Sequence, residues 1–175
     1  RGKVVVADFI YTTCSDICPA LTAQMASLRT RLADAGLLGD DVVLLSISVD
    51  PARDTPEVLR TYSAPFAADP ANWLFLTGDE AAIRQVVVDG FMLGVEVMEA
   101  AAQDAAAHEA GTATHSLDDG HAGGHGATPS GDYEVSHSGR FVVIDRSWQV
   151  RGYYDSAGLD QDQLVSTLRT LAANG

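Results

Sequence analysis

The sequence contains little cysteine, few basic residues and no long apolar run. Of its 175 residues 2 are cysteines, and 11 Lys and Arg stand against 24 Asp and Glu, a formal net charge of −13. So acidic a chain has no basic surface to displace counterions from a phosphate backbone, which excludes nucleic-acid binding. No apolar run reaches the roughly 20 residues that a membrane-spanning helix needs. The apolar fraction of 46% still suffices for a packed core, which excludes global disorder.

Basic residues are absent from the whole segment between Arg84 and Arg140. Within it, residues 99–131 consist mainly of alanine, glycine, histidine, threonine, serine and acidic residues, with one large apolar side chain, Leu117. Such a segment buries too little surface to offset its ordering entropy, so we predict a long mobile insertion. It holds His108, His115, His121 and His125. Tracts rich in Gly and His can capture metal ions, but this spacing predicts no fixed geometry, and a plain linker stays an equal alternative.

The remaining sequence alternates between strand and helix patterns. Short β-branched runs predict strands, and apolar residues spaced three and four apart predict helices. The predicted strands are 3–10, 42–49, 73–77 and 93–98, followed by a hairpin of 141–144 and 149–154. The predicted helices are 17–36, 54–64, 79–89 and 160–173. Alternation implies a parallel core and the hairpin adds antiparallel strands, so we predict an α/β fold with a mixed sheet and flanking helices.

Cys14 and Cys18 follow the first predicted strand, where the first helix begins. On a helix, a spacing of four places both side chains on one face, with Cβ atoms roughly 5–6 Å apart. The dipole and unpaired N–H groups at a helix N-terminus stabilise thiolates, so we expect a lowered cysteine pKa. Such a pair can cycle between dithiol and disulfide, or it can hold a soft metal ion. The third alternative is structural: a plain disulfide or two buried thiols. A disulfide closing so short a loop would constrain the unfolded chain little.

His137 lies just before the predicted hairpin and supplies a third donor type. A single histidine at such a position is more often a capping or surface residue than a ligand. Two thiolates and one imidazole, however, form a three-coordinate soft set that suits Cu(I). Zinc normally takes a fourth ligand, which water or the histidine-rich segment would have to supply.

Three blocks of the sequence resemble the Sco/SenC family of copper-binding proteins. The first, residues 9–19, contains Cys14-Ser15-Asp16-Ile17-Cys18-Pro19, similar to the family's Cys-x-x-x-Cys-Pro motif. The second is the run from Ser48 to Pro56, and the third runs from Asp132 through His137 to Gly139 and is followed by 142–145. The blocks occur in the family's order and span nearly the whole chain.

The resemblance implies a single thioredoxin-like domain over residues 1–175, lacking the family's N-terminal strands and its membrane anchor. It also implies that Cys14, Cys18 and His137 bind Cu(I) or Cu(II), and that the cysteine pair can be oxidised. The implied role is a metallochaperone that helps to assemble the CuA site in subunit II of cytochrome c oxidase. The implied partners include a copper donor and a thioredoxin-like reductant, and the implied location is the periplasmic face of a bacterial inner membrane or the mitochondrial intermembrane space.

Two other functions use the same residues. A thiol–disulfide reductase of the thioredoxin type would use Cys14 and Cys18 alone, but such proteins usually space these cysteines by three and place a proline where this chain has Ser136 to Gly139. A copper or redox sensor would share all three ligands and deliver no metal. Enzymatic activity is therefore left open, with thiol–disulfide exchange as its only candidate reaction.

Overall fold

The computed structural model describes residues 2–14, 17–92, 95–99, 133–137 and 139–174, with the backbone alone in 95–99 and 133–137. The insertion predicted at 99–131 lies, apart from residue 99, outside the described residues. Within them, no helix combines the length and the hydropathy that crossing a membrane would require.

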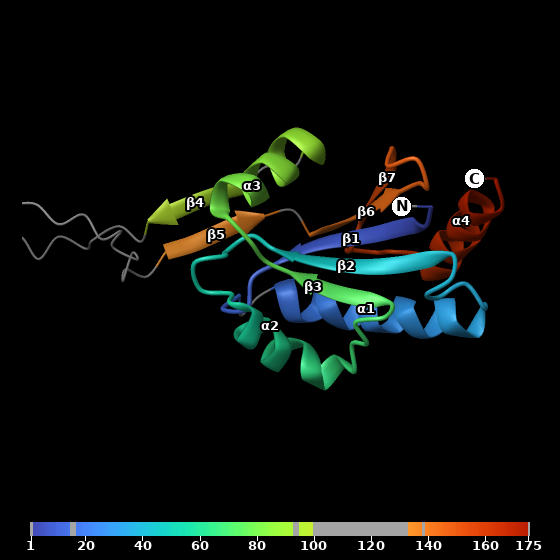
Figure 1. Cartoon of the computed structure of the whole chain (residues 1–175), viewed down its shortest axis with the longest axis horizontal. Coiled ribbons are helices and arrows are strands. Elements are labelled where there is room, and N and C mark those ends of the chain that lie inside the picture. The colour runs from blue at the N-terminus through green and yellow to red at the C-terminus, as the bar shows by residue number, and fades with distance from the viewer. Residues whose placement is uncertain (1, 15–16, 93–94, 100–132, 138, 175) are drawn as a thin grey trace, which may run out of the picture.

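The fold is organised around a five-stranded sheet with the strand order β3-β2-β1-β6-β7 (Figure 1). Its strands are β1 (Val4–Ile10), β2 (Val42–Ser48), β3 (Trp73–Leu76), β6 (Arg140–Ile144) and β7 (Val150–Asp155). Strands β1, β2 and β3 are parallel, whereas β6 runs antiparallel to both β1 and β7. The mixed sheet predicted from the sequence is confirmed.

Helices cover both faces of this sheet (Figure 1). One face packs against α1 (Ile17–Asp34), α2 (Pro56–Ser63) and α4 (Gln161–Ala173), and a short 3₁₀ turn, η1 (Ala64–Phe66), continues α2. The other face packs against α3 (Glu80–Arg84) and the π-helical turn η2 (Gln85–Gly90). Because both faces are covered, every residue of the central strand β1 is buried.

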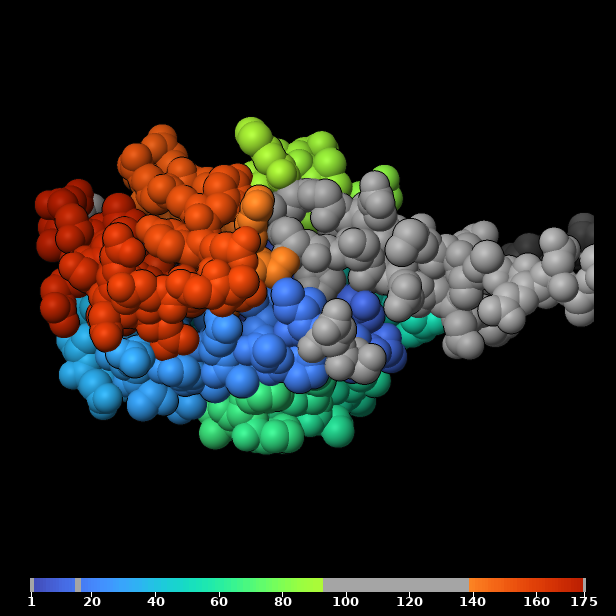
Figure 2. Space-filling model, turned by 180° about the vertical axis from the view of Figure 1, so that it is seen from behind, coloured from blue at the N-terminus to red at the C-terminus, as the bar shows by residue number. Residues whose placement is uncertain are grey.

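The apolar stripe predicted on α1 is the largest contribution of a helix to the core. Its members are all fully buried: Leu21, Met25, Leu28 and Leu32. Figure 2 shows the C-terminal elements, in orange and red, lying directly against blue α1. The Gln161 side-chain amide donates to the Gln24 carbonyl at 3.1 Å and ties α4 to α1.

The fourth predicted strand forms, but it does not join the main sheet. Strand β4 (Val95–Glu99) pairs antiparallel with β5 (Tyr133–His137) in a separate two-stranded ribbon. The expectation of a fourth parallel strand is therefore wrong. Its partner is more than 30 residues further along the chain, so no local pattern pointed to the pairing.

The central strand also carries a charged residue into the core. Asp8 on β1 is fully buried and faces the same side of the sheet as Val6 and Ile10, because side chains alternate along a strand. Its register partner on β2 is Ser46, whose hydroxyl oxygen accepts a hydrogen bond from Trp73 Nε1 at 3.0 Å. Among the described residues, neither carboxyl oxygen of Asp8 has a hydrogen-bond partner.

Burial raises the pKa of Asp8 from 3.8 to about 7. The Ser46 hydroxyl is near enough to lower this pKa somewhat, although it lies outside hydrogen-bonding geometry with either carboxyl oxygen. Because the folded-state pKa lies above the unfolded value, the folded protein holds this proton more tightly than the unfolded chain does. Ionisation of Asp8 therefore costs stability as the pH rises above about 4, and the cost is complete above pH 7.

We expect the Asp8→Asn substitution to remove this pH dependence. The displacement from 3.8 to about 7 corresponds to about 4 kcal/mol, so the variant should gain up to that amount relative to the wild type between pH 4 and pH 8. Urea unfolding of the reduced, metal-free proteins across that range measures the difference. A difference between the two free energies of unfolding that stays constant with pH would contradict the assignment. The exposed Asp40→Asn variant is the matched control and should follow the wild type.

Candidate metal centre

Cys14 and Cys18 lie where β1 leaves the sheet and the chain turns into α1. The Cys14 N–H donates to the Tyr11 carbonyl at 3.2 Å, and Cys18 is the second residue of α1. Both side chains are buried, with 8% of Cys14 and none of Cys18 exposed. The carboxyl edge of parallel strands, where this turn lies, is the edge at which open α/β sheets place ligand sites.

The two cysteines do not share one helix, so that part of the prediction is wrong. Helix α1 begins at Ile17, and Cys14 precedes it. The two residues are instead joined by a hydrogen bond in which the backbone N–H of Cys18 donates to Cys14 Sγ at 3.4 Å. A backbone N–H directed at sulfur favours a thiolate over a thiol. The first turn of α1 thus places an electrostatically favourable group against Cys14.

For Cys18 the expected lowering of the pKa is also wrong. Burial raises the pKa of this thiol well above its usual range, and the interaction with Cys14 raises it further. A hydrogen bond involving the Tyr11 backbone opposes the shift but does not outweigh burial. Cys18 is therefore a neutral thiol at physiological pH, and any metal ion that bound it would have to displace its proton.

Hydrogen bonds connect the Cys18 backbone to α2. The Thr22 hydroxyl donates to the Cys18 carbonyl at 2.9 Å and lies 2.9 Å from the Tyr62 hydroxyl. Since the Thr22 proton is used on the carbonyl, the Tyr62 O–H donates to Thr22. Burial raises the pKa of Tyr62 to about 12, which keeps that proton in place.

Asp54 fixes the turn that leads into Cys14. Its buried carboxylate accepts hydrogen bonds from the Thr12 N–H at 3.1 Å, from the Thr12 hydroxyl and from the Ser48 hydroxyl at 2.6 Å. It therefore ties the cysteine turn to the end of β2. In the same loop, Arg53 Nη1 lies 3.6 Å from Asp50 Oδ2. All three residues belong to the second sequence block, and their contacts hold the loop that follows β2.

His137 is the last residue of β5, where it pairs with Val95, and its side chain lies outside the described residues. Gly139 follows two residues further and begins the segment that enters β6. A Cβ atom on Gly139 would lie 2.4 Å from Ile17 Cδ1, so the backbone here packs directly on the residue before Cys18. The antiparallel pairing of β6 with β1 explains this approach, because β6 starts beside the end of β1. The segment that carries His137 thus leads to the cysteine turn.

Asp8 is the residue near this site that the sequence analysis missed. It lies on the face of the sheet that packs on α1, and it interacts electrostatically with Cys18 and Tyr62. One acidic residue within the apolar run Val4–Ile10 was the available signal. Among the described side chains, no group of three His, Cys, Asp or Glu residues converges as a metal site.

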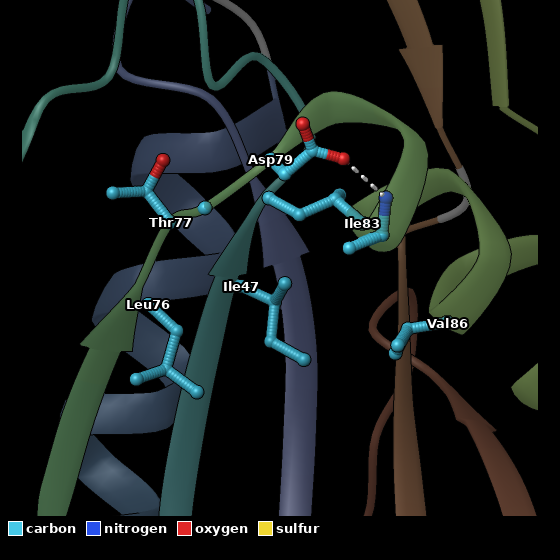
Figure 3. Close-up of a pocket in the computed structure, with 8 residues that line it drawn as sticks. Ile47, Leu76, Thr77, Asp79, Ile83 and Val86 are labelled. Atoms are coloured by element: carbon cyan, nitrogen blue, oxygen red, sulfur yellow. Dashed lines mark hydrogen bonds between the residues drawn. The ribbon is translucent and has the colours of Figure 1, made fainter.

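An apolar pocket of about 240 Å³ lies on the opposite face of the sheet (Figure 3). Ile47, Leu76, Ile83 and Val86 line it, and the Asp79 carboxylate at its rim accepts a hydrogen bond from the Ala82 N–H at 3.0 Å. Ile47 belongs to the core on the side away from the cysteines. This pocket is therefore separate from the cysteine site.

Comparison with known proteins places these observations in a family. The B. subtilis SCO1 protein homolog is 38% identical over 92 residues, which cover 52% of this chain and 46% of that protein. A Stutzerimonas stutzeri protein to which copper binding is ascribed is 26% identical over 174 residues, covering 99% of this chain and 68% of its own.

A solved structure gives the same result for the fold. BsSco, described as a member of the Sco family of cytochrome c oxidase assembly proteins with a disulfide switch, superposes with a TM-score of 0.68. It is 26% identical, and the match covers 99% of this chain and 82% of that one. The SCO1/SenC family model matches residues 1–118, which include the cysteine turn and the three parallel strands β1, β2 and β3. This chain belongs to the SCO1/SenC family.

Proposed function

We propose that this protein is a copper chaperone that carries Cu(I) on Cys14, Cys18 and His137. The observation that carries the proposal is the buried cysteine pair, joined through the Cys18 N–H and Cys14 Sγ at 3.4 Å. The packing of Gly139 on Ile17 supports the addition of the histidine, because it brings the third sequence block to the cysteine turn.

The donor set suits copper as cargo. Two sulfurs and one imidazole are soft ligands, and Cu(I) accepts three-coordinate geometry that structural zinc sites rarely adopt. The imidazole nitrogen would also let the site hold Cu(II). The copper binding ascribed to the S. stutzeri relative supports the same cargo.

The destination we propose is the CuA site in subunit II of cytochrome c oxidase. The oxidase-assembly role stated for the Sco family of BsSco supports it. A disulfide has no thiolates to bind copper, so loading requires a reductant that keeps the cysteines as a dithiol. It also requires a copper donor. Such redox dependence fits an oxidising compartment outside the cytoplasm, which we propose to be the bacterial periplasm or the mitochondrial intermembrane space.

Thiol–disulfide exchange at the same pair is the second candidate function. The contact between the Cys18 N–H and Cys14 Sγ favours it, because it holds the two residues close and stabilises a Cys14 thiolate. The disulfide switch described for BsSco supports it as well.

A competitive Cu(I) titration of the reduced protein against a chromophoric chelator tests the ligand set. We expect one tightly bound copper per chain. Cys14→Ser and Cys18→Ser should abolish tight binding, and His137→Ala should weaken it by more than the roughly 10- to 100-fold that changes outside the ligand shell cost.

The control is a variant in which His108, His115, His121 and His125 are all alanine. It should retain the tight site, because these residues belong to the separate histidine-rich segment. If His137→Ala kept its copper affinity and the four-histidine control lost tight binding, the third ligand would be a histidine of that segment and not His137. Absence of tight copper in the wild type would leave thiol–disulfide exchange as the function.

Oxidation should prevent copper loading. A disulfide between Cys14 and Cys18 removes both thiolates, so we expect the oxidised protein to take up no tightly bound Cu(I) until it is reduced. Copper and thiol content, measured after gel filtration of each form, tests this. Equal copper in the oxidised and reduced forms would show that the cysteines are not the ligands.

A further inference from the structure

Asp8 is a buried titratable group that the proposed copper site does not use as a ligand. It is six residues before Cys14 on β1 and points into the core that contains both cysteines. It is fully buried, and neither of its oxygens has a hydrogen-bond partner among the described residues. Such surroundings favour the protonated carboxyl group over the carboxylate.

Among the described residues, the elements packed around Asp8 place no lysine, arginine or histidine side chain in its core. Strand β2 contributes Ser46, α1 contributes Cys18 and α2 contributes Tyr62, while β6 and α4 contribute apolar side chains. Across the part of the chain that the structure describes, none of the buried side chains is a lysine, arginine or histidine. A negative charge on Asp8 therefore has no counterion among the buried side chains that the structure describes.

Cu(I) loading adds a negative charge to the same core. Two thiols lose two protons when they bind one Cu(I), so the dithiolate–copper unit with a neutral imidazole has a net charge of −1. An ionised Asp8 would repel this unit through a medium that screens poorly. Asp8 already interacts unfavourably with the ionised form of Cys18 in the metal-free protein.

We propose that Asp8 is a positioning residue that couples copper loading to its own protonation. The proposal rests on the proposed copper-chaperone function. When Asp8 starts ionised, the Cys14 and Cys18 thiols lose two protons to bind Cu(I), one goes to the Asp8 carboxylate, and one proton per copper reaches solvent. When Asp8 starts protonated, both protons reach solvent.

This coupling adds to the copper affinity a pH dependence that the Asp8→Asn variant lacks, beyond the dependence that the cysteine protons give to both proteins. At pH 5.5 Asp8 is protonated before and after loading, so its ionisation does not change the affinity for Cu(I). At pH 8, one pH unit above the pKa of about 7, loading must first return the proton to Asp8. The wild type should then bind Cu(I) about tenfold more weakly than Asp8→Asn, whereas the two should bind alike at pH 5.5.

The test combines two measurements made anaerobically on the whole chain. The first is a chelator-competition Cu(I) titration of wild type, Asp8→Asn and the exposed control Asp40→Asn at pH 5.5 and pH 8. The second follows the ¹³C resonance of the Asp8 carboxyl group against pH, in the metal-free and the Cu(I)-loaded wild type. The second needs no variant, so it decides the matter even if Asp8→Asn fails to fold.

We expect the Asp8 midpoint to rise by at least one pH unit on copper loading, and the tenfold difference in affinity to appear at pH 8 only. A residue with a purely structural role would change the affinity equally at both pH values. Tight copper binding with an Asp8 midpoint that does not move would overturn this inference and leave the proposed function intact. Absence of tight copper binding in the wild type would overturn both.

Discussion

Strand β1 is buried along its whole length, and the placement of the site depends on that constraint. A strand covered on both faces has one register with its neighbours, so its end is fixed in space. The cysteine turn follows from that end and is tied to β2 through Asp54. Strand β6 pairs antiparallel with β1, so the start of β6 lies beside the end of β1 and Gly139 packs against Ile17. One central strand thus positions two segments that are more than 100 residues apart.

The same burial makes negative charges at the site unfavourable. Burial raises the pKa of both Cys18 and Asp8, and no buried basic residue of the described chain compensates a charge on either. Burial disfavours a Cys18 thiolate until a soft cation arrives to share its charge. Such a site would take on its negative charge together with the proposed copper ion. This behaviour suits a protein that must hold copper and later release it.

Local patterns predicted the fold well where burial follows periodicity. The stripe of Leu21, Met25, Leu28 and Leu32 on α1 and the apolar run of β1 behave as their spacing implies, because both form the core directly. The pairing of β4 with β5 could not be predicted, since it joins strands across a long insertion of unrelated composition. The cysteine pair was recognisable from its motif, but the pKa of Cys18 was not. It depends on how deeply the first turn of α1 is packed, which a sequence does not state.

We propose that two sulfurs and one histidine nitrogen bind a single copper ion. X-ray absorption spectroscopy of the Cu(I)-loaded wild type and of His137→Ala tests it directly, because it counts the donor atoms around the metal. We expect two sulfur neighbours and one nitrogen neighbour around copper in the wild type. In His137→Ala we expect the nitrogen neighbour alone to be lost. A wild-type spectrum with fewer than two sulfurs, or an unchanged nitrogen in His137→Ala, would contradict it.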